Sequence, residues 1–464
     1  MIAAVGTMLL AVSTGAFEVV SIPLEPPEAQ IFALAADDDA TAEIAVLAER
    51  DLRIYGIDTG NLRFAVTLPE NAPAFDVFDA DGDGAAEIMA IQSGGVLLIE
   101  LDEPDAAPRE LFRVDHLIDD SQGGYPRPHI LATQRNGRWL VAIPRESSLE
   151  LRALDGTVVE TFSLGSGGES AALFERPFAA RTVYPNLVGP PGAVEMHIDQ
   201  VVVHDFPSAS APSPATRDAL GPGGFVHLQS DGEDEPQRWP WFSLTTKDGV
   251  QQRVLYALTE PDYEDTLIRI QQPETSHPLN GEGHAQVSPE RRYRGSLIPP
   301  QQMLPDFNAD GYTDLLLWCA PRPGTSIQAV TEALTSRSWP LELRVQCFEP
   351  EKNRYDPRSV SVIRTRVPIG WFLHPERGIP LYLPLLGDFN GDGRTDVAFA
   401  TGASEYCAWT CGDEGFPARP SFQRSFPENI DRLEIRADLD GTGRIGAVIR
   451  GERHIYVLKP ATGR

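Results

Sequence analysis

Three short acidic segments of the chain have the residue types and the spacing that bind a hard divalent cation. They begin at Asp79, Asp306 and Asp388, and each carries an oxygen-bearing side chain at its positions 1, 3, 5 and 9. With a backbone carbonyl at position 7, these groups supply the six or more oxygen ligands that calcium prefers, and glycine at position 6 permits the sharp turn. The predicted ligands are Asp79, Asp81, Asp83, Glu87 and the carbonyl of Ala85; Asp306, Asn308, Asp310, Asp314 and the carbonyl of Tyr312; and Asp388, Asn390, Asp392, Asp396 and the carbonyl of Arg394.

An EF-hand opens in the same way, so the residues that follow must decide between the two kinds of loop. An EF-hand needs a bidentate glutamate at position 12 and a helix on either side. Position 12 is Ala90, Leu317 or Phe399 here, and each lies in an apolar, strand-like run. The EF-hand is therefore excluded. A solvated turn without metal stays open for any one loop, but three copies with one spacing favour structural calcium at about three sites.

Two weaker copies of the acidic segment flank the three strong ones. Each keeps some acidic positions and has lost others, so calcium binding is predicted to be weaker there. The first keeps Asp37, Asp39 and Glu43 but starts with Ala35, and the last keeps Asp438 and Asp440 but has Thr442 and Gly446 at later ligand positions.

The elements that must position these loops are short strands. Each acidic segment leads into an apolar strand, and a second pattern of two alternating strands around an Asp, Thr and Gly turn follows, as in residues 52–66 and 149–162. This second pattern is typical of a β-hairpin. Loop, strand and hairpin together predict a small antiparallel sheet of roughly four strands, the size of one propeller blade.

The two ends of the chain predict how such a ring closes. The last repeat ends with the strand and turn of residues 454–464, and its returning strand is missing, whereas residues 17–24 form a strand with no loop before it. Pairing the two strands would complete the last blade and cover both sheet edges.

The number of blades depends on a region of weak signal. Repeats start near residues 31, 75, 128, 194, 252, 303, 385 and 435, whereas residues 165–300 contain no intact acidic loop. That region still has strand-like segments at 195–203, 253–258 and 266–270, with Pro- and Ser-rich loops that indicate insertions. The fold class predicted is all-β: a seven-bladed propeller of four-stranded antiparallel blades, with an eight-bladed propeller as the alternative.

The segment from Leu386 to Ala398, Leu-Gly-Asp-Phe-Asn-Gly-Asp-Gly-Arg-Thr-Asp-Val-Ala, resembles the core motif of the FG-GAP/VCBS repeat family, which includes the propellers of integrin α-subunits. The resemblance covers about half of the chain through three strong and two weaker loops. It implies a β-propeller in which calcium sits in a turn between adjacent strands of a blade. It also reaches propellers with lyase, dehydratase or lectin roles.

Composition bounds the partners and the compartment. The chain has 39 Lys and Arg against 67 Asp and Glu, a net charge of −28, which excludes nucleic acid as a favoured partner. Residues 1–16 are uncharged, small and apolar, as in a signal peptide, although a first buried strand is the alternative. The expected organisation is thus a signal peptide at 1–16 and one propeller domain at 17–464, with no membrane span in the mature chain and with a secreted, periplasmic or cell-surface location.

The four cysteines are an even set in a chain predicted to be exported. Such a set favours one or two structural disulfides, with buried free thiols as the alternative. Their spacing is not that of a zinc site. The cysteines are Cys319, Cys347, Cys407 and Cys411.

No catalytic residues are predicted, because the chain lacks the HExxH, GxSxG and GxxxxGK motifs. A binding, adhesion or structural module that recognises a protein or a glycan is therefore favoured. A carbohydrate-active enzyme or a lectin on a propeller scaffold is the alternative, and fold alone does not decide between them.

Overall fold

The computed structural model describes the chain in segments. They are residues 16–34, 41–101 except 71, 73, 82 and 93, 107–115, 127–128, 132–135, 138–145, 148–163, 192–196, 201–205, 217–218, 225–228, 237–245, 251–258, 265–271, 288–298, 305–319, 335–358, 361–368 and 382–461. The predicted signal peptide lies outside these residues except for Ala16, as do Ala35, Asp37 and Asp39 of the first weak loop.

The described elements are almost all β-strands, arranged in antiparallel sheets, which confirms the all-β prediction. In the first half of the chain the sheets are β2(Gln30–Leu34), β3(Glu43–Ala48), β4(Asp51–Gly56), β5(Leu62–Thr67); β6(Ala74–Phe78), β7(Glu87–Gln92), β8(Gly95–Glu100), β9(Arg109–Arg113), with β10(Arg127–Pro128) parallel to β6; β11(Ala132–Arg135), β12(Arg138–Arg145), β13(Ser148–Ala153), β14(Val158–Ser163); and β15(Gly192–Met196), β16(Val201–Asp205), β17(Arg217–Asp218).

The second half continues the same pattern. Its sheets are β18(Phe225–Leu228), β19(Gln237–Thr245), β20(Gln251–Leu258), β21(Asp265–Gln271), β22(Arg291–Arg294); β23(Ser296–Leu297), β24(Leu315–Cys319), β25(Ser338–Gln346), β28(Ser361–Pro368); the hairpin β26(Phe348–Glu349), β27(Arg354–Tyr355), which flanks the 3-10 helix η1(Pro350–Lys352); β29(Tyr382–Gly387), β30(Asp396–Gly402), β31(Glu405–Trp409), β32(Phe422–Ser425); and β33(Ile430–Ala437), β34(Gly446–Gly451), β35(His454–Pro460), joined by β1(Phe17–Pro23). Among the described residues there are thus eight larger sheets of three to five strands and one two-stranded sheet.

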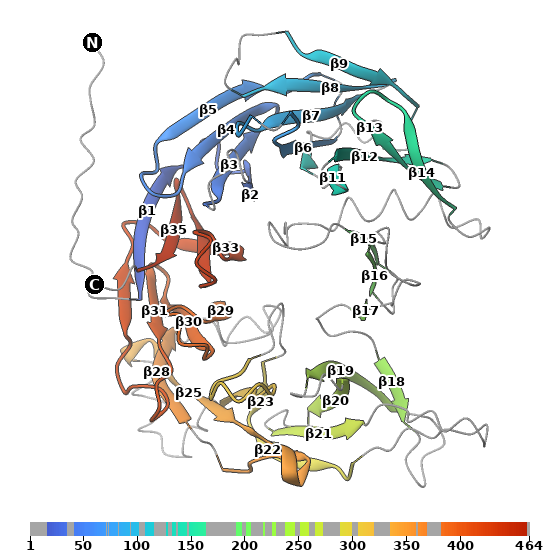
Figure 1. The fold of residues 1–464 in the computed structure, drawn as a ribbon. Helices are drawn as coiled ribbons and strands as arrows, with labels where there is room; N and C mark the ends of the chain where they lie inside the picture. The colour runs from blue at the N-terminus through green and yellow to red at the C-terminus, as the bar shows by residue number, and fades with distance from the viewer. Residues whose placement is uncertain are drawn as a thin grey trace, which may run out of the picture.

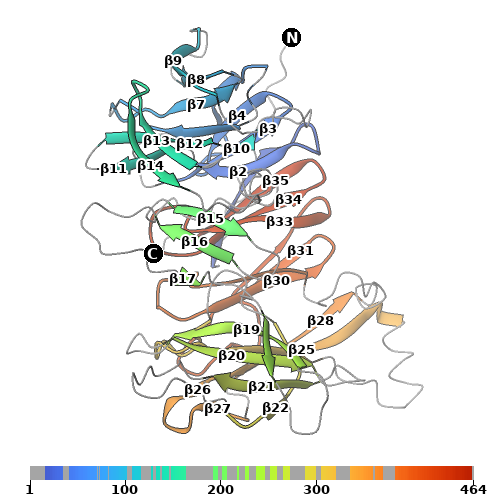
Figure 2. The same cartoon turned by 90° about the vertical axis from the view of Figure 1, so that its right-hand side faces the viewer.

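The larger sheets follow one another around a central axis in chain order, a propeller-like arrangement (Figure 1). The first strands of several sheets, such as β2, β29 and β33, lie toward the middle, and last strands such as β5 and β9 lie at the rim (Figure 1). Figure 2 shows the sheet that contains β33, β34 and β35 between β2–β5 on one side and β30 and β31 on the other. Strand β33 accordingly contacts both β2 and β29.

Hydrophobic cores fill the spaces between neighbouring sheets. One core joins Phe32 and Leu47 of the β2–β5 sheet to Phe75 and Ile88 of the next sheet, and equivalent cores lie between five further pairs of neighbouring sheets. Because both faces of a sheet are covered, the second strands are buried along almost their whole length, as in β7 and β34. In rim strands such as β5, side chains that face the core alternate with side chains that face solvent.

Some strand predictions for the weak region are confirmed and one is wrong. The segments at 253–258 and 266–270 lie in β20 and β21. The segment at 195–203 is not one strand, because β15 and β16 pair with each other as the two arms of a hairpin. The predicted segment therefore spans the end of one strand and the start of the next. The Pro- and Ser-rich insertion at 206–214 lies outside the described residues.

The two terminal strands pair as predicted. Strand β1 is antiparallel to β35 over seven residue pairs, from Phe17 opposite Pro460 to Pro23 opposite His454. Phe17 is fully buried, and its ring centroid lies 4.9 Å from that of Phe389 and 5.4 Å from that of Phe422. The N-terminal strand is therefore held by packing against the preceding sheet as well as by backbone hydrogen bonds.

A buried arginine fixes the segment that leaves β1 toward β2. Arg450 of β34 pairs with Glu434 and donates to the carbonyl oxygens of Pro27 and Ala29, the latter at 2.5 Å. These contacts satisfy a buried guanidinium, which would otherwise be costly. In the part of the chain that the structure describes, no helix is long and apolar enough to cross a membrane.

Candidate metal centre

Each intact acidic loop joins the first two strands of a sheet, where the resemblance to FG-GAP repeats implies that calcium binds. The loop beginning at Asp79 lies between β6 and β7, the one at Asp306 between β23 and β24, and the one at Asp388 between β29 and β30. The weaker loop at Asp438 joins β33 and β34 in the same manner.

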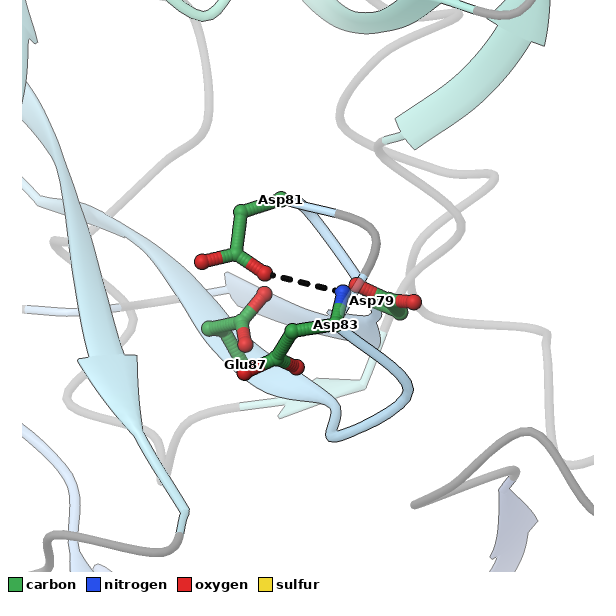
Figure 3. A group of neighbouring side chains, drawn as sticks. All are labelled: Asp79, Asp81, Asp83 and Glu87. Carbon is green, nitrogen blue, oxygen red and sulfur yellow. Dashed lines mark hydrogen bonds between the residues drawn. The ribbon is translucent and has the colours of Figure 1, made fainter.

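The first loop gathers four carboxylates around one point. Single carboxylate oxygens of Asp79, Asp81, Asp83 and Glu87 all lie within 4.8 Å of one another. Figure 3 shows these side chains converging, with the Asp83 amide donating to Asp81. Four like charges at this spacing repel one another unless a cation or protons intervene, and oxygen-only ligands suit calcium. The donor set therefore fits calcium.

Amide hydrogen bonds inside the loop hold the carboxylates in place. Position 1 accepts from the amide of position 6, position 3 from position 5, position 5 from position 7, and position 9 from position 2. In the first loop these bonds are Gly84 to Asp79 (3.1 Å), Asp83 to Asp81 (3.2 Å), Ala85 to Asp83 (2.8 Å) and Ala80 to Glu87 (2.6 Å).

The other two intact loops repeat this pattern bond for bond, so the three sites share one backbone conformation. The distances are 2.8, 3.2, 2.9 and 2.8 Å in the loop at Asp306, and 2.7, 2.9, 2.9 and 2.9 Å in the loop at Asp388. The glycine at position 6 has φ of +92° at Gly84, +86° at Gly311 and +81° at Gly393. Glycine is favoured there by this left-handed conformation and not by lack of space, since a Cβ at Gly393 would meet nothing within 4 Å.

The carboxyl group at position 9 is the buried member of each set. Burial raises the pKa of Glu87, Asp314 and Asp396 to about 7 in each case, although backbone hydrogen bonds partly oppose this shift. The second oxygen of Asp314 accepts from the amide of Phe348 at 2.9 Å, and that of Asp396 from the amide of Cys411 at 2.7 Å. In these two loops the carboxylate thus ties the loop to the chain beyond the third strand.

Among the described residues, no lysine, arginine or histidine forms an ion pair with Glu87, Asp314 or Asp396. Arg394, at position 7 of the third loop, pairs with the exposed Asp413 outside the loop. Among the described residues, no basic side chain therefore neutralises these three buried carboxyl groups.

The two weaker loops differ in this respect. Glu43, at position 9 of the first, is buried and pairs with Arg63 of β5. In the last loop, the guanidinium of Arg444 lies 3.3 Å from a carboxylate oxygen of Asp440. The structure thus places Asp438 and Asp440 in a loop that contains its own cationic group.

Neighbouring loops are joined to each other through backbone groups. Thr395, beside the ligand Asp396, donates its amide to the carbonyl oxygen of Asp306 at 2.7 Å, and its hydroxyl accepts from the Asp306 amide at 2.8 Å. Ile445 of the last loop donates to the carbonyl oxygen of Asp388 at 2.8 Å. The loops beginning at Asp306, Asp388 and Asp438 are therefore joined in a continuous belt.

The predicted disulfides are absent, and this prediction is corrected. All four cysteines are buried free thiols. Each sulfur has a polar neighbour of its own: the carbonyl of Arg294 for Cys319, the Asp314 carboxylate for Cys347, the Thr401 hydroxyl for Cys407 and the carbonyl of Phe307 for Cys411, at 3.3–3.4 Å. An even number of cysteines does not determine whether their side chains face one another.

No family model matches the chain, and no curated protein matches it. Solved structures to which it is similar include the C-terminal WD40 domain of Sif2 (TM-score 0.34, 13% identity, 96% of this chain and 99% of that one), BBS1N in complex with ARL6DN (0.30, 7%, 96% and 97%) and the Neurospora crassa Pan2 WD40 domain (0.30, 10%, 96% and 95%). These TM-scores are all below 0.5, too low to transfer a fold or a function to this chain.

Sequence reasoning identified the acidic side chains of the loops but missed the groups around them. Thr395 stood at position 8 of a loop without any signal that it bonds to the preceding loop. Arg63 lies 20 residues from Glu43, in the rim strand of the same sheet. A search for basic residues on strands adjacent to the weaker loops could have found Arg63, whereas Arg394 and Arg444 occupy equivalent positions and only their packing distinguishes them.

Proposed function

We propose that this protein is an exported β-propeller, stabilised by calcium, that serves as a scaffold for binding another protein. Eight larger sheets among the described residues favour the eight-bladed alternative over seven blades. Pairing of β1 with β35 supports closure of the ring by the two ends of the chain.

One observation carries the calcium part of the proposal. Three loops have the same amide-to-carboxylate bonds, and each buries a carboxylate that has no basic partner among the described residues. In the first of these loops four carboxylates also lie within 4.8 Å of one another. In this proposal, calcium is bound by Asp79, Asp81, Asp83 and Glu87, and by the corresponding side chains of the other two loops. Carbonyl oxygens of Ala85, Tyr312 and Arg394 complete the sets.

The location and the partner follow from charge and calcium chemistry. Extracellular modules bind calcium with dissociation constants of about 10⁻⁴ to 10⁻³ M, which suits a protein outside the cell. A net charge of −28 favours a partner with a basic surface, because complementary charge accelerates encounter.

Calorimetric titration of the metal-free protein with calcium tests the proposal. We expect about three sites, because each intact loop supplies one full ligand set. Combining Asp83→Asn, Asp310→Asn and Asp392→Asn should abolish binding, since each substitution removes the ligand charge at position 5 of one loop.

A matched control separates loop chemistry from general acidity. Asp155 is exposed and accepts the Thr157 amide at 2.9 Å in a hairpin turn that has no acidic cluster. Asp155→Asn should leave the calcium titration unchanged. If the wild-type protein takes up no calcium, the acidic loops are turns and the calcium part of the proposal is wrong.

A further inference from the structure

The last acidic loop keeps the shape of the intact loops although it has lost two of their ligand side chains. Its Gly443 amide donates to Asp438 at 2.7 Å and its Thr442 amide to Asp440 at 3.2 Å, matching the bonds of the loop at Asp388. Gly441 and Gly443 have φ of +69° and +80°, close to the +84° and +81° of Gly391 and Gly393. Because the loop lacks a full set of metal ligands, some other group must stabilise the neighbouring carboxylates of Asp438 and Asp440.

The side chain of Arg444 provides that group. Its Nη2 lies 3.3 Å from Oδ2 of Asp440, its Nε donates to the Thr442 hydroxyl at 3.0 Å, and its Nη1 donates to the carbonyl oxygen of Ala461 at 2.7 Å. The Thr442 hydroxyl in turn donates to Asp440. The side chains of Arg444 and Asp440 are each only 13% exposed, so the pair is sheltered from solvent.

The position of this arginine in the loop does not by itself direct the side chain inward. Arg394 has the same position in the neighbouring loop, yet it pairs with Asp413, whose side chain is 89% exposed. The carbonyl of Ala461, just after β35, gives Arg444 a fixed anchor inside its own sheet. Packing against the end of β35 therefore selects the inward direction.

The charges of the loops balance in the same way if the guanidinium replaces a metal. The last loop has two carboxylates and one guanidinium, which leaves one negative charge. The loops at Asp306 and Asp388 have three carboxylates each, so one calcium ion would also leave one negative charge. In the other weak loop the buried Glu43 likewise pairs with an arginine, Arg63.

We propose that Arg444 is the resident cation of the loop Asp438–Gly446 and holds it closed without a metal ion. The comparison with intact loops rests on the proposed calcium function, but the role of Arg444 does not. The loop at 438–446 is thus a calcium-independent member of the belt, and its carbonyl acceptor Asp388 lets it support the neighbouring loop whether or not calcium is present.

Hydrogen exchange of the full-length protein, followed by mass spectrometry, tests this inference. Peptides that cover 438–446 and 388–396 are compared with calcium and with chelator, in the wild type and in Arg444→Gln. We expect chelator to accelerate exchange in 388–396 but not in 438–446 of the wild type. Arg444→Gln should accelerate exchange in 438–446 about tenfold under both conditions, because the carboxylates lose their cation.

Two further variants give the test its controls. Arg424→Gln makes the same charge change at an exposed position of β32 and should leave both peptides unchanged. Arg444→Lys keeps the charge but cannot reach Asp440, Thr442 and Ala461 together, so its exchange should fall between wild type and Arg444→Gln. It also gives a folded variant if the glutamine substitution disrupts the sheet.

The outcomes separate the two proposals. If chelator accelerates 438–446 in the wild type as much as 388–396, or if Arg444→Gln exchanges like the wild type, Arg444 is not the resident cation. If instead 388–396 ignores chelator while Arg444→Gln still opens 438–446, the calcium function fails and the role of Arg444 stands.

Discussion

Asp396 allows the structural role of an acidic loop to be separated from its proposed metal role. Its buried carboxylate accepts the Phe389 amide at 2.9 Å and the Cys411 amide at 2.7 Å. Asp396→Ala leaves both buried amides without an acceptor, at about 1–3 kcal/mol each, so we expect a loss of about 4 kcal/mol in chelator. Calcium at one hundred times its dissociation constant adds about 2.7 kcal/mol per site to the wild type, and the variant should lose this as well.

Asp392→Ala in the same loop should behave differently. This side chain is exposed and accepts the Arg394 amide at 2.9 Å, where water can replace it. We expect a change below about 0.5 kcal/mol in chelator, with the same loss of the calcium increment.

Urea unfolding with and without calcium measures both terms. It should be done at pH 8, above the pKa of about 7 to which burial raises Asp396, so that the carboxylate is charged. Equal stability of the two variants in chelator would refute the argument from buried amides. A full calcium increment in either variant would refute metal ligation at this loop.

Three further predictions concern the rest of the fold. Phe17→Ala should lower the free energy of urea unfolding by about 3–5 kcal/mol, because a fully buried ring is lost from between two phenylalanines; an unchanged midpoint would mean that β1 is not held by packing. Arg450→Met should lower the free energy of urea unfolding by about 3–5 kcal/mol, because Glu434 loses its buried partner and the carbonyl oxygens of Pro27 and Ala29 lose their donors. Arg432→Met, at the exposed partner of the same carboxylate, should cost below about 1 kcal/mol in the same assay. Thiol labelling at pH 8 should modify none of the four cysteines in the native protein, since burial raises the pKa of Cys407 to about 11 and that of Cys411 to about 12; labelling of fewer than four in urea without reductant would reveal a disulfide.

Much of the fold could be predicted from local patterns in the sequence. The hairpin at 52–66 is found as β4 and β5, because alternation and turn residues act within a few positions of the chain. The pairing of β1 with β35 was predictable although residues 24–453 lie between the two strands, since the last repeat lacked one strand. That inference needed only the repeat and not the three-dimensional contact.

Contacts between repeats could not be predicted in this way. Thr395 and Asp306 lie 89 residues apart, and their two hydrogen bonds depend on how adjacent sheets pack. Arg394 and Arg444 both occupy position 7 of their loops, but Arg394 pairs with a residue outside its loop and Arg444 with a residue inside it. The four thiols likewise have separate polar partners, so the number of cysteines did not predict whether they pair.

The register of β1 on β35 determines how the molecule responds to a pulling force. Phe17 lies opposite Pro460, so the chain enters β1 and leaves β35 at the same end of the ladder. Tension applied at the two ends would break the residue pairs of the ladder one after another, starting from Phe17 and Pro460. It would not load all seven pairs in shear at once. A protein tethered through both ends would therefore release β1 first.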